Sequence, residues 1–265
     1  MPQVAVILGI IEGLTEFLPV SSTGHLILAG HFLNFTGEAA STFEIFIQLG
    51  AILAVVLLYY QRFAGLIIPD RQKPMGFSGV RGLGLLLMTT LPALILGALF
   101  HHSIKAYLFN PKSVAIGLAA GSVWILLTER FCKKFRKSGV DSLNFKEALI
   151  IGFFQCLAMW PGVSRAGATI LGAMMIGIDR KTATEYSFFA AAPVIFAASL
   201  LDLVKSLHVL HASDIPFFAV GFIVSFVSAL VIVKFFIRYV SKHTLNAFAW
   251  YRLAVAAAVL FFWKV

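Results

Sequence analysis

The sequence predicts an all-α polytopic membrane protein, an inverted-topology repeat of six transmembrane helices and two re-entrant helical hairpins. Of its 265 residues 60% are hydrophobic and only 12% are charged, outside the usual range of soluble globular domains. Apolar stretches long enough to cross a bilayer recur along the chain, and two further apolar regions are broken at their centres. We expect one membrane domain over residues 1–265, with repeats at about 1–131 and 140–265.

Six uninterrupted apolar stretches predict the transmembrane helices. Each has a length that suits one crossing of the hydrocarbon core. In chain order they are residues 39–60, 83–100, 113–128, 186–204, 216–237 and 247–265.

The remaining apolar regions, residues 4–32 and 148–178, are interrupted by FLPVSSTGH and by WPGVSRAGAT. Each half is too short to cross a bilayer. A proline among small polar residues exposes backbone groups that lipid cannot satisfy, so such a break is stable only inside protein or beside a water-filled cavity. We therefore expect re-entrant hairpins. A kinked full span is the alternative for either region, since Pro and Gly are common in transmembrane helices.

The two broken regions also resemble each other. A shift of 143 residues pairs glycine with glycine and serine with serine, at Gly9 with Gly152, Ser21 with Ser164 and Gly24 with Gly167. Three apolar spans follow each region. A hairpin returns to its starting side and three spans then reverse it, so the second half is predicted to be inserted upside down.

The distribution of charge predicts the orientation. Of the 21 Lys and Arg residues, 14 fall in loops 61–82, 129–146, 178–185 and 238–246, which this topology puts on one side. By the positive-inside rule that side is cytoplasmic, and both termini and the mouth of the first hairpin lie on the outer side. The net charge of +9 therefore reflects orientation, and no nucleic-acid partner is expected.

Glu12 and Glu16 lie four residues apart in an otherwise apolar stretch, hence on one face of the first half-helix. Carboxylates in or near a bilayer need partners. A pair of them indicates a cation site or a shared proton, and two structural hydrogen bonds are the alternative.

Hydroxyl groups follow the first break. Ser21, Ser22 and Thr23 are placed to cap the second half-helix, and His25 lies three residues beyond Ser22, on the same face. A serine with a histidine is typical of a nucleophile with its base. The alternative is that the hydroxyls only cap the helix.

The second break supplies a permanent cation. Arg165 follows Ser164 at the predicted start of a half-helix, where free N–H groups and a guanidinium together favour phosphate. Gly162 allows a close backbone approach, and Thr169 adds a hydroxyl. Pairing of Arg165 with Glu12 or Glu16 alone is the alternative.

EGLTEFLPVSSTGH, at residues 12–25, and PGVSRAGAT, at 161–169, resemble the two signature motifs of the bacterial undecaprenyl-pyrophosphate phosphatase family, also known for bacitracin resistance. The resemblance covers essentially the whole chain. It implies an enzyme of the bacterial inner (plasma) membrane that hydrolyses undecaprenyl pyrophosphate to undecaprenyl phosphate and phosphate. This reaction recycles the lipid carrier of peptidoglycan and other envelope polymers. The resemblance also implies an active site reached from the periplasmic side.

The resemblance further implies the roles of single residues. The catalytic set is Ser22, His25, Glu12, Glu16 and Arg165; the substrate-binding set is Ser21, Thr23, Gly162, Ser164, Arg165 and Thr169. A divalent cation, Mg²⁺ or Ca²⁺, is expected, with Glu12 and Glu16 as oxygen ligands. Ala166 stands where the family commonly has serine. The expected partners are the isoprenyl pyrophosphate lipid and the membrane, with a homodimer as an open possibility.

We expect Ser22 to attack the terminal phosphorus while His25 takes or returns a proton. Attack by His25 itself, or by water with His25 as base, are alternatives. The competing class is a secondary transporter or flippase for a polyprenyl phosphate or another anion, because such proteins share this architecture. Anion transport would need Arg165 without the adjacent serine and histidine, so hydrolysis is favoured.

Three further acidic or polar side chains and one arginine attract attention. Glu44 and Gln48, one turn apart, are predicted to line the entrance to the site, and Glu185 occupies a similar place after the second hairpin. Arg252, inside the last span, is expected to pair with a carboxylate or to extend to the interface.

Overall fold

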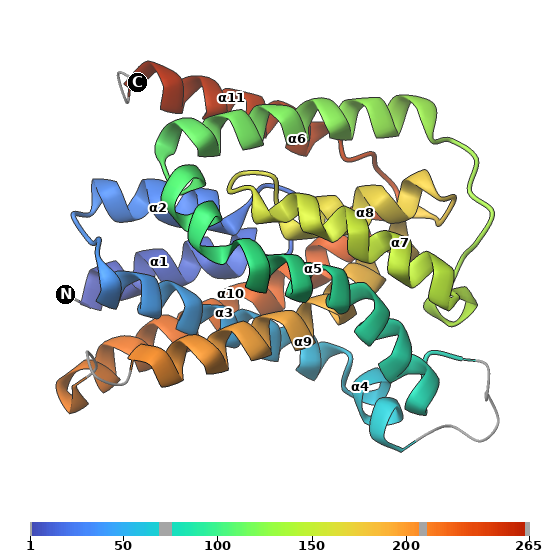
Figure 1. Ribbon diagram of the computed structural model, residues 1–265, viewed down its shortest axis with the longest axis horizontal. Coiled ribbons are helices and arrows are strands. Elements are labelled where there is room, and N and C mark those ends of the chain that lie inside the picture. Colours follow the sequence, from blue (N-terminus) through green and yellow to red (C-terminus); the bar gives the residue numbers. More distant parts are fainter. Residues whose placement is uncertain (1, 69–75, 207–210, 263–265) are drawn as a thin grey trace.

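The protein is described by a computed structural model that covers residues 2–68, 76–206 and 211–262. These residues form helices and no β-strand, as the sequence predicts (Figure 1). The α-helices are α1 (Pro2–Thr15), α2 (Ser22–Phe32), α3 (Glu38–Leu58), α4 (Tyr60–Ile67), α5 (Gly79–Leu108), α6 (Pro111–Phe131), α7 (Phe145–Cys156), α8 (Arg165–Met175), α9 (Arg180–Ser206), α10 (Ile215–Val240) and α11 (Asn246–Phe262).

Local sequence signals set several helix starts. The Asn110 side chain accepts a hydrogen bond from the Ser113 N–H at 2.9 Å, and Pro111 occupies the first turn of α6, where its missing N–H costs nothing. Asn144 and Glu147 form a reciprocal capping box at the start of α7. These polar caps fix where the apolar helices begin.

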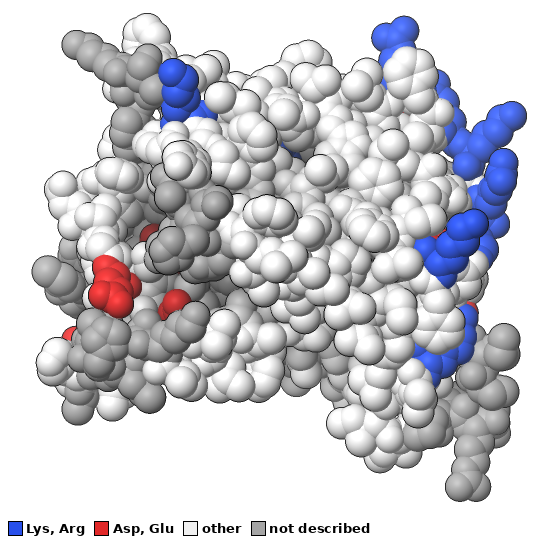
Figure 2. All heavy atoms as spheres, viewed as in Figure 1, with Lys and Arg blue, Asp and Glu red and all other residues white. Residues whose placement is uncertain are grey.

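Five helices within the described ranges are long and apolar enough to cross a membrane. They are Glu38–Leu58, Gly79–Phe100, Pro111–Phe131, Arg180–Val204 and Ile215–Val240. On the face drawn in Figure 2, charged side chains lie near the two ends of the molecule, and the middle is almost free of them. The exposed side chains of these helices include many large hydrophobic ones, such as Leu87, Phe196 and Val231. Such a surface suits lipid rather than water, so the chain is a multi-pass membrane protein.

The sixth predicted span, residues 247–265, corresponds to the shorter apolar helix Asn246–Phe262. Its last three residues lie outside the described ranges. The other five predicted spans each fall on one of the long helices, which extend beyond the apolar stretch at one end or both.

The predicted breaks are present, and both end in the same way. Residues 16–21 separate α1 from α2, and a short 3₁₀ turn followed by a loop separates α7 from α8. Ser21 has φ 72° and caps α2, whereas Ser164 has φ 78° and caps α8. Each hydroxyl accepts a hydrogen bond from a glycine N–H three residues later, Gly24 at 3.3 Å or Gly167 at 3.0 Å.

The helices pack in a regular scheme. α1 lies along α10 and α7 lies along α5, while α3 packs against α9 and α6 against α11 (Figure 1). Glycines permit the first two contacts. A Cβ atom on Gly9 would lie 2.7 Å from the Gly221 carbonyl oxygen, and one on Gly152 would lie 2.6 Å from that of Thr89. The two broken regions therefore dock on their neighbours through equivalent glycines.

Candidate active site

A cavity of about 780 Å³ lies where the two breaks meet. Its volume falls in the range of small-molecule sites. The first break and the start of α2 contribute Glu16, Ser21, Ser22 and Thr23, and the second contributes Gly162, Ser164 and Arg165. The apolar wall comes from α2, α3, α5 and α9, and includes Ile27, Ile45, Gly97, Val194 and Ile195. The cavity thus combines a polar end with an apolar wall.

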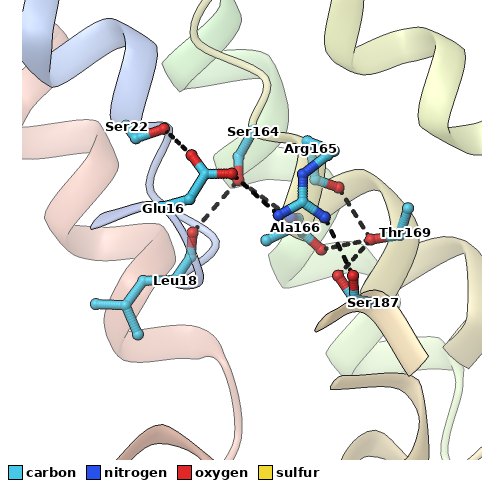
Figure 3. Close-up of polar contacts among 9 residues, drawn as sticks. Glu16, Leu18, Ser22, Ser164, Arg165, Ala166, Thr169 and Ser187 are labelled. Atoms are coloured by element: carbon cyan, nitrogen blue, oxygen red, sulfur yellow. Dashed lines mark hydrogen bonds and ion pairs between the residues drawn. The ribbon is translucent and has the colours of Figure 1, made fainter. Parts of the chain in front are cut away.

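Glu16 joins the two breaks. One carboxylate oxygen accepts a hydrogen bond from the Ser22 hydroxyl, and the other accepts one from Arg165 Nη2 at 3.1 Å (Figure 3). The Glu16 and Arg165 side chains are only 8% and 14% exposed. Of the two glutamates considered as partners of Arg165, the structure therefore selects Glu16. The Ser22 hydroxyl, the Glu16 carboxylate and the Arg165 guanidinium thus form one hydrogen-bonded row.

Arg165 retains unused hydrogen-bonding capacity. Its Nη1 donates to the Ser187 carbonyl at 3.1 Å, whereas its buried Nε has no hydrogen-bond partner among the described residues. A buried donor without a partner is unusual in a protein interior. Arg165, which lines the cavity, therefore has one N–H donor that no described residue uses.

Thr169 lies behind Arg165 rather than on the cavity wall. Its hydroxyl is 2.6 Å from the Ser187 hydroxyl and donates to the Arg165 carbonyl at 3.0 Å (Figure 3). It therefore holds the first turn of α8 against α9. Sequence reasoning missed Ser187, because nothing in the α9 sequence distinguishes this serine from others in apolar helices.

The starts of α2 and α8 both border the cavity. Ser22 and Thr23 lie on its wall from the first turn of α2, and Arg165 from that of α8. The Ser164 hydroxyl also lies 3.4 Å from the Leu18 carbonyl, across the junction of the breaks. Helix N-termini carry partial positive charge and free N–H groups, so this end of the cavity suits an anion.

His25 points away from this row. Its Nδ1 lies 2.8 Å from the Ser21 carbonyl oxygen, and its Nε2 lies 2.8 Å from the Tyr251 hydroxyl. The imidazole ring also stacks on the ring of Tyr251. The expected Ser22–His25 pair is not formed in the described structure, since the Ser22 hydroxyl contacts Glu16 instead. Tyr251 was missed because it lies 226 residues away in sequence. The part that His25 plays in the reaction stays a prediction.

Glu12 is fully buried one turn before Glu16. Neither of its carboxylate oxygens has a hydrogen-bond partner in the described part of the chain. Burying an unsatisfied carboxylate is costly unless it takes up a proton or a cation. The oxygen donors of Glu12 and Glu16 suit a hard divalent ion, although two carboxylates alone would leave most of its coordination to water or substrate.

Two further acidic side chains and a glutamine line the cavity. Glu44 and Gln48 of α3 line the cavity, as the sequence predicts, and Asp202 of α9 lines it as well. Asp202 was missed because it stands near the end of a span, where acidic residues usually face water. Glu185 is not on the cavity wall, and lies 4.0 Å from the Lys181 ammonium at the other end of α9.

The expectation for Arg252 was wrong. Its side chain is fully buried, so it does not extend to an interface. Its hydrogen bonds all go to main-chain carbonyl groups, and among the described residues no carboxylate pairs with it. Carbonyl partners have no signature in the sequence, which explains the error.

Comparisons with known proteins identify the family and several relatives of this chain. The family model described as "Bacitracin resistance protein BacA" matches residues 5–258. A relative from Solidesulfovibrio magneticus named "Undecaprenyl-diphosphatase" is 56% identical over 259 residues, covering 98% of this chain and 97% of the relative. Relatives of the same name from Maridesulfovibrio salexigens and Nitratidesulfovibrio vulgaris (strain DP4) are 57% and 55% identical, covering 98% and 97% of both chains.

Proposed function

This chain belongs to the bacitracin resistance protein BacA family, and from that premise we propose that it hydrolyses undecaprenyl pyrophosphate to undecaprenyl phosphate and inorganic phosphate. The observation that carries the proposal is the row of Ser22, Glu16 and Arg165 at the polar end of the cavity. It sets a nucleophile, a proton acceptor and a phosphate-binding cation side by side. The apolar wall would receive the adjoining part of the isoprenyl chain.

Ser22 is the proposed nucleophile. Its oxygen forms a bond to the terminal phosphorus, and the bond from that phosphorus to the bridging oxygen breaks, releasing undecaprenyl phosphate. Glu16 accepts the serine proton, because the Ser22 hydroxyl already donates to its carboxylate. Water then displaces the serine oxygen from the phosphoryl group and releases phosphate. In this scheme His25 supports the turn at Ser21 rather than acting as the base.

Arg165 and the first turns of α2 and α8 are proposed to hold the phosphates. Arg165, Ser22 and Thr23 line the cavity, and the Nε of Arg165 has no partner among the described residues. Donors placed before the reaction stabilise the charge that develops on the phosphoryl oxygens without reorganising. The fork of Arg165 allows two parallel hydrogen bonds to one phosphate once its contact with Glu16 is exchanged.

A divalent cation is proposed as cofactor, with Glu12 and Glu16 as its protein ligands. The support is the buried Glu12 carboxylate, whose two oxygens have no partner in the described ranges. Mg²⁺ or Ca²⁺ would neutralise phosphate charge when bound. Both ions bind oxygen ligands, which are what the two side chains offer.

The proposed topology is an inverted repeat with two re-entrant hairpins and six spans, in a bacterial inner membrane. Three equivalences support it: the serine caps 143 residues apart, the matched glycine contacts of α1 and α7, and the packing of α1 on α10 beside that of α7 on α5. The start of α1 and the end of α11 lie at one end of the molecule (Figure 1), and most Lys and Arg of the drawn face lie at the other (Figure 2). The proposed orientation puts the termini and the cavity mouth in the periplasm.

Phosphate release in detergent tests the function. Purified protein is supplied with undecaprenyl pyrophosphate and divalent cation, beside the variants Ser22→Ala and Glu16→Gln and the control Ser138→Ala, whose serine lies in an exposed loop. Wild type and control should release phosphate, and the two site variants should not. Absence of release by folded wild-type protein would reject hydrolysis and favour transport of the lipid.

A further inference from the structure

We infer that Arg252 is a positioning residue, which ties the main chains of both breaks to α6 and so sets Ser22 and Arg165 against each other. The inference deepens the proposed function and rests on it for the activity measurements. Arg252 belongs to α11, is fully buried and does not line the cavity. Any effect on the reaction therefore passes through other residues.

All five N–H donors of this guanidinium are used. Arginine offers one donor at Nε and two at each Nη. Nε donates to Leu118 at 3.3 Å, Nη1 to Pro19 at 2.8 Å and Val163 at 3.0 Å, and Nη2 to Gly117 at 3.1 Å and Gly162 at 2.8 Å, in every case to the carbonyl oxygen. One side chain thus joins four segments of the chain: α11, α6 and both breaks.

The two bonds from Nη1 are the ones that matter for the site. They join the carbonyl of Pro19 in the first break to that of Val163 in the second. Ser22 follows Pro19 by three residues, and Arg165 follows Val163 by two. A single nitrogen therefore bridges the backbone segments that lead into the nucleophile and into the phosphate-binding cation.

The residues between these anchors and the site are strained. Ser21 and Ser164 adopt φ 72° and φ 78°, in the left-handed region that residues with a Cβ atom rarely occupy. Such conformations persist only where the surroundings determine them. Each serine immediately precedes its site residue, and the carbonyl bonds of Arg252 constrain the chain just before each serine. The arginine is thus placed to hold both turns.

The surface of α6 is shaped for this arrangement. A Cβ atom on Gly121 would lie 1.9 Å from Arg252 Nη2, and one on Gly117 would lie 2.3 Å from the Pro161 carbonyl oxygen. A Cβ atom on Gly162, whose φ is 96°, would lie 2.3 Å from the Val114 carbonyl oxygen. Only glycines leave room for the guanidinium and for the second break. Gly121 therefore offers an independent way to displace Arg252.

Lysine cannot replace this arginine. Its ammonium has three donors at one point, which cannot reach five carbonyls spread over three segments, α6 and the two breaks. Arg252→Lys keeps the charge and removes the bridge. Gly121→Ala keeps Arg252, but the new methyl group displaces its guanidinium. Matched controls are Arg238→Lys, at an exposed position of α10, and Gly65→Ala, where the nearest atom to a new Cβ would be 4.0 Å away.

The test combines kinetics with hydrogen exchange. Misplacement of reacting groups by about 1 Å costs on the order of 10²-fold in rate. Arg252→Lys and Gly121→Ala should therefore lose kcat on that scale, while Arg238→Lys and Gly65→Ala keep wild-type kcat. Amide exchange should rise in peptides covering residues 16–24 and 158–167 and stay unchanged in α3 and α9. A purely structural role would raise exchange throughout the molecule.

A double variant makes the kinetic prediction sharper. If Arg252 acts through Ser22 and Arg165, then Arg165→Lys combined with Arg252→Lys should lose less activity than the product of the two single losses. Fully additive losses, or wild-type kcat in both Arg252→Lys and Gly121→Ala, would overturn the inference. If the wild-type protein is inactive, only the proposed function is rejected. A rise in amide exchange confined to the two breaks of the variants would still show that Arg252 anchors them. Should Arg252→Lys fail to fold, Gly121→Ala decides the outcome.

Discussion

At the scale of single residues, the site depends on which polar groups are already satisfied. Glu16 is satisfied at both oxygens, by Ser22 and by Arg165. Glu12 and the Nε of Arg165 are buried without partners in the described chain. Burial without a partner is unfavourable and persists mainly where a ligand supplies the missing contact. The unpaired donor of Arg165 and the unpaired carboxylate of Glu12 are thus the groups on which the proposed phosphate and cation sites depend.

Arg165→Lys should reduce kcat by about 10²-fold or more, in the range reported for loss of a transition-state donor. Lysine keeps the charge and loses the planar fork that binds phosphate through two parallel bonds. Phosphate release by purified protein measures the change. Arg62→Lys, which alters an exposed arginine paired with Asp141, is the control and should keep wild-type activity. Equal activity of both variants would contradict a bidentate role.

Glu12→Gln should weaken cation binding without unfolding the protein. The amide has nearly the same shape as the carboxylate but lacks the charge that a divalent ion requires. Binding of Ca²⁺ measured by calorimetry in detergent should be lost or much weaker in the variant and retained in Glu38→Gln, on the exposed first turn of α3. Unchanged binding in Glu12→Gln would remove this residue from the cation site.

The sequence predicted those residues that act through local rules. Ser21 and Ser164 were identified because a helix cap depends on its own neighbours. The partners of His25 and Arg252 were not, because Tyr251 is distant in the chain and main-chain carbonyls carry no sequence signal. Spacing put His25 on the face of Ser22, but α2 turns that ring toward α11 instead.

At the scale of elements, the short helices α1 and α7 depend on close contact with α10 and α5. Both breaks and five of the six spans were evident from apolar runs and prolines. The sequence did not predict which helices pair, because packing decides which apolar faces are in contact. Glycines mark the closest of these contacts, because a Cβ atom at those positions would clash with the backbone of the neighbouring helix.

Gly9→Ala and Gly152→Ala should each destabilise the protein by about 1–3 kcal/mol, as expected for overpacking a close helix contact. Their new methyl groups would meet carbonyl oxygens at 2.7 Å and 2.6 Å. Gly97→Ala is the matched control, because a Cβ atom there has nothing within 4 Å. Thermal unfolding in detergent should give lower Tm for the first two variants only. Similar losses in both would fit the equivalence of α1 and α7.

At the scale of the whole molecule, charge and topology make one prediction. Ser213 lies in the connection before α10, and Ser138 lies in the basic loop before α7. Both are exposed, and the proposed orientation puts them on opposite sides of the membrane. Replacing each by cysteine, after removal of Cys132 and Cys156, gives two proteins that differ only in the position of one thiol.

A membrane-impermeant maleimide added to intact cells should label Ser213→Cys and spare Ser138→Cys, because the positive-inside rule holds the Lys- and Arg-rich loops in the cytoplasm. Permeabilised cells should label both, which shows that each thiol is reactive. The reverse pattern would mean that the protein has the opposite orientation, with the cavity mouth on the cytoplasmic side, since the proposed topology puts the mouth and the termini on one side of the membrane. Labelling of both in intact cells would contradict a fixed orientation and with it the assignment of a periplasmic site.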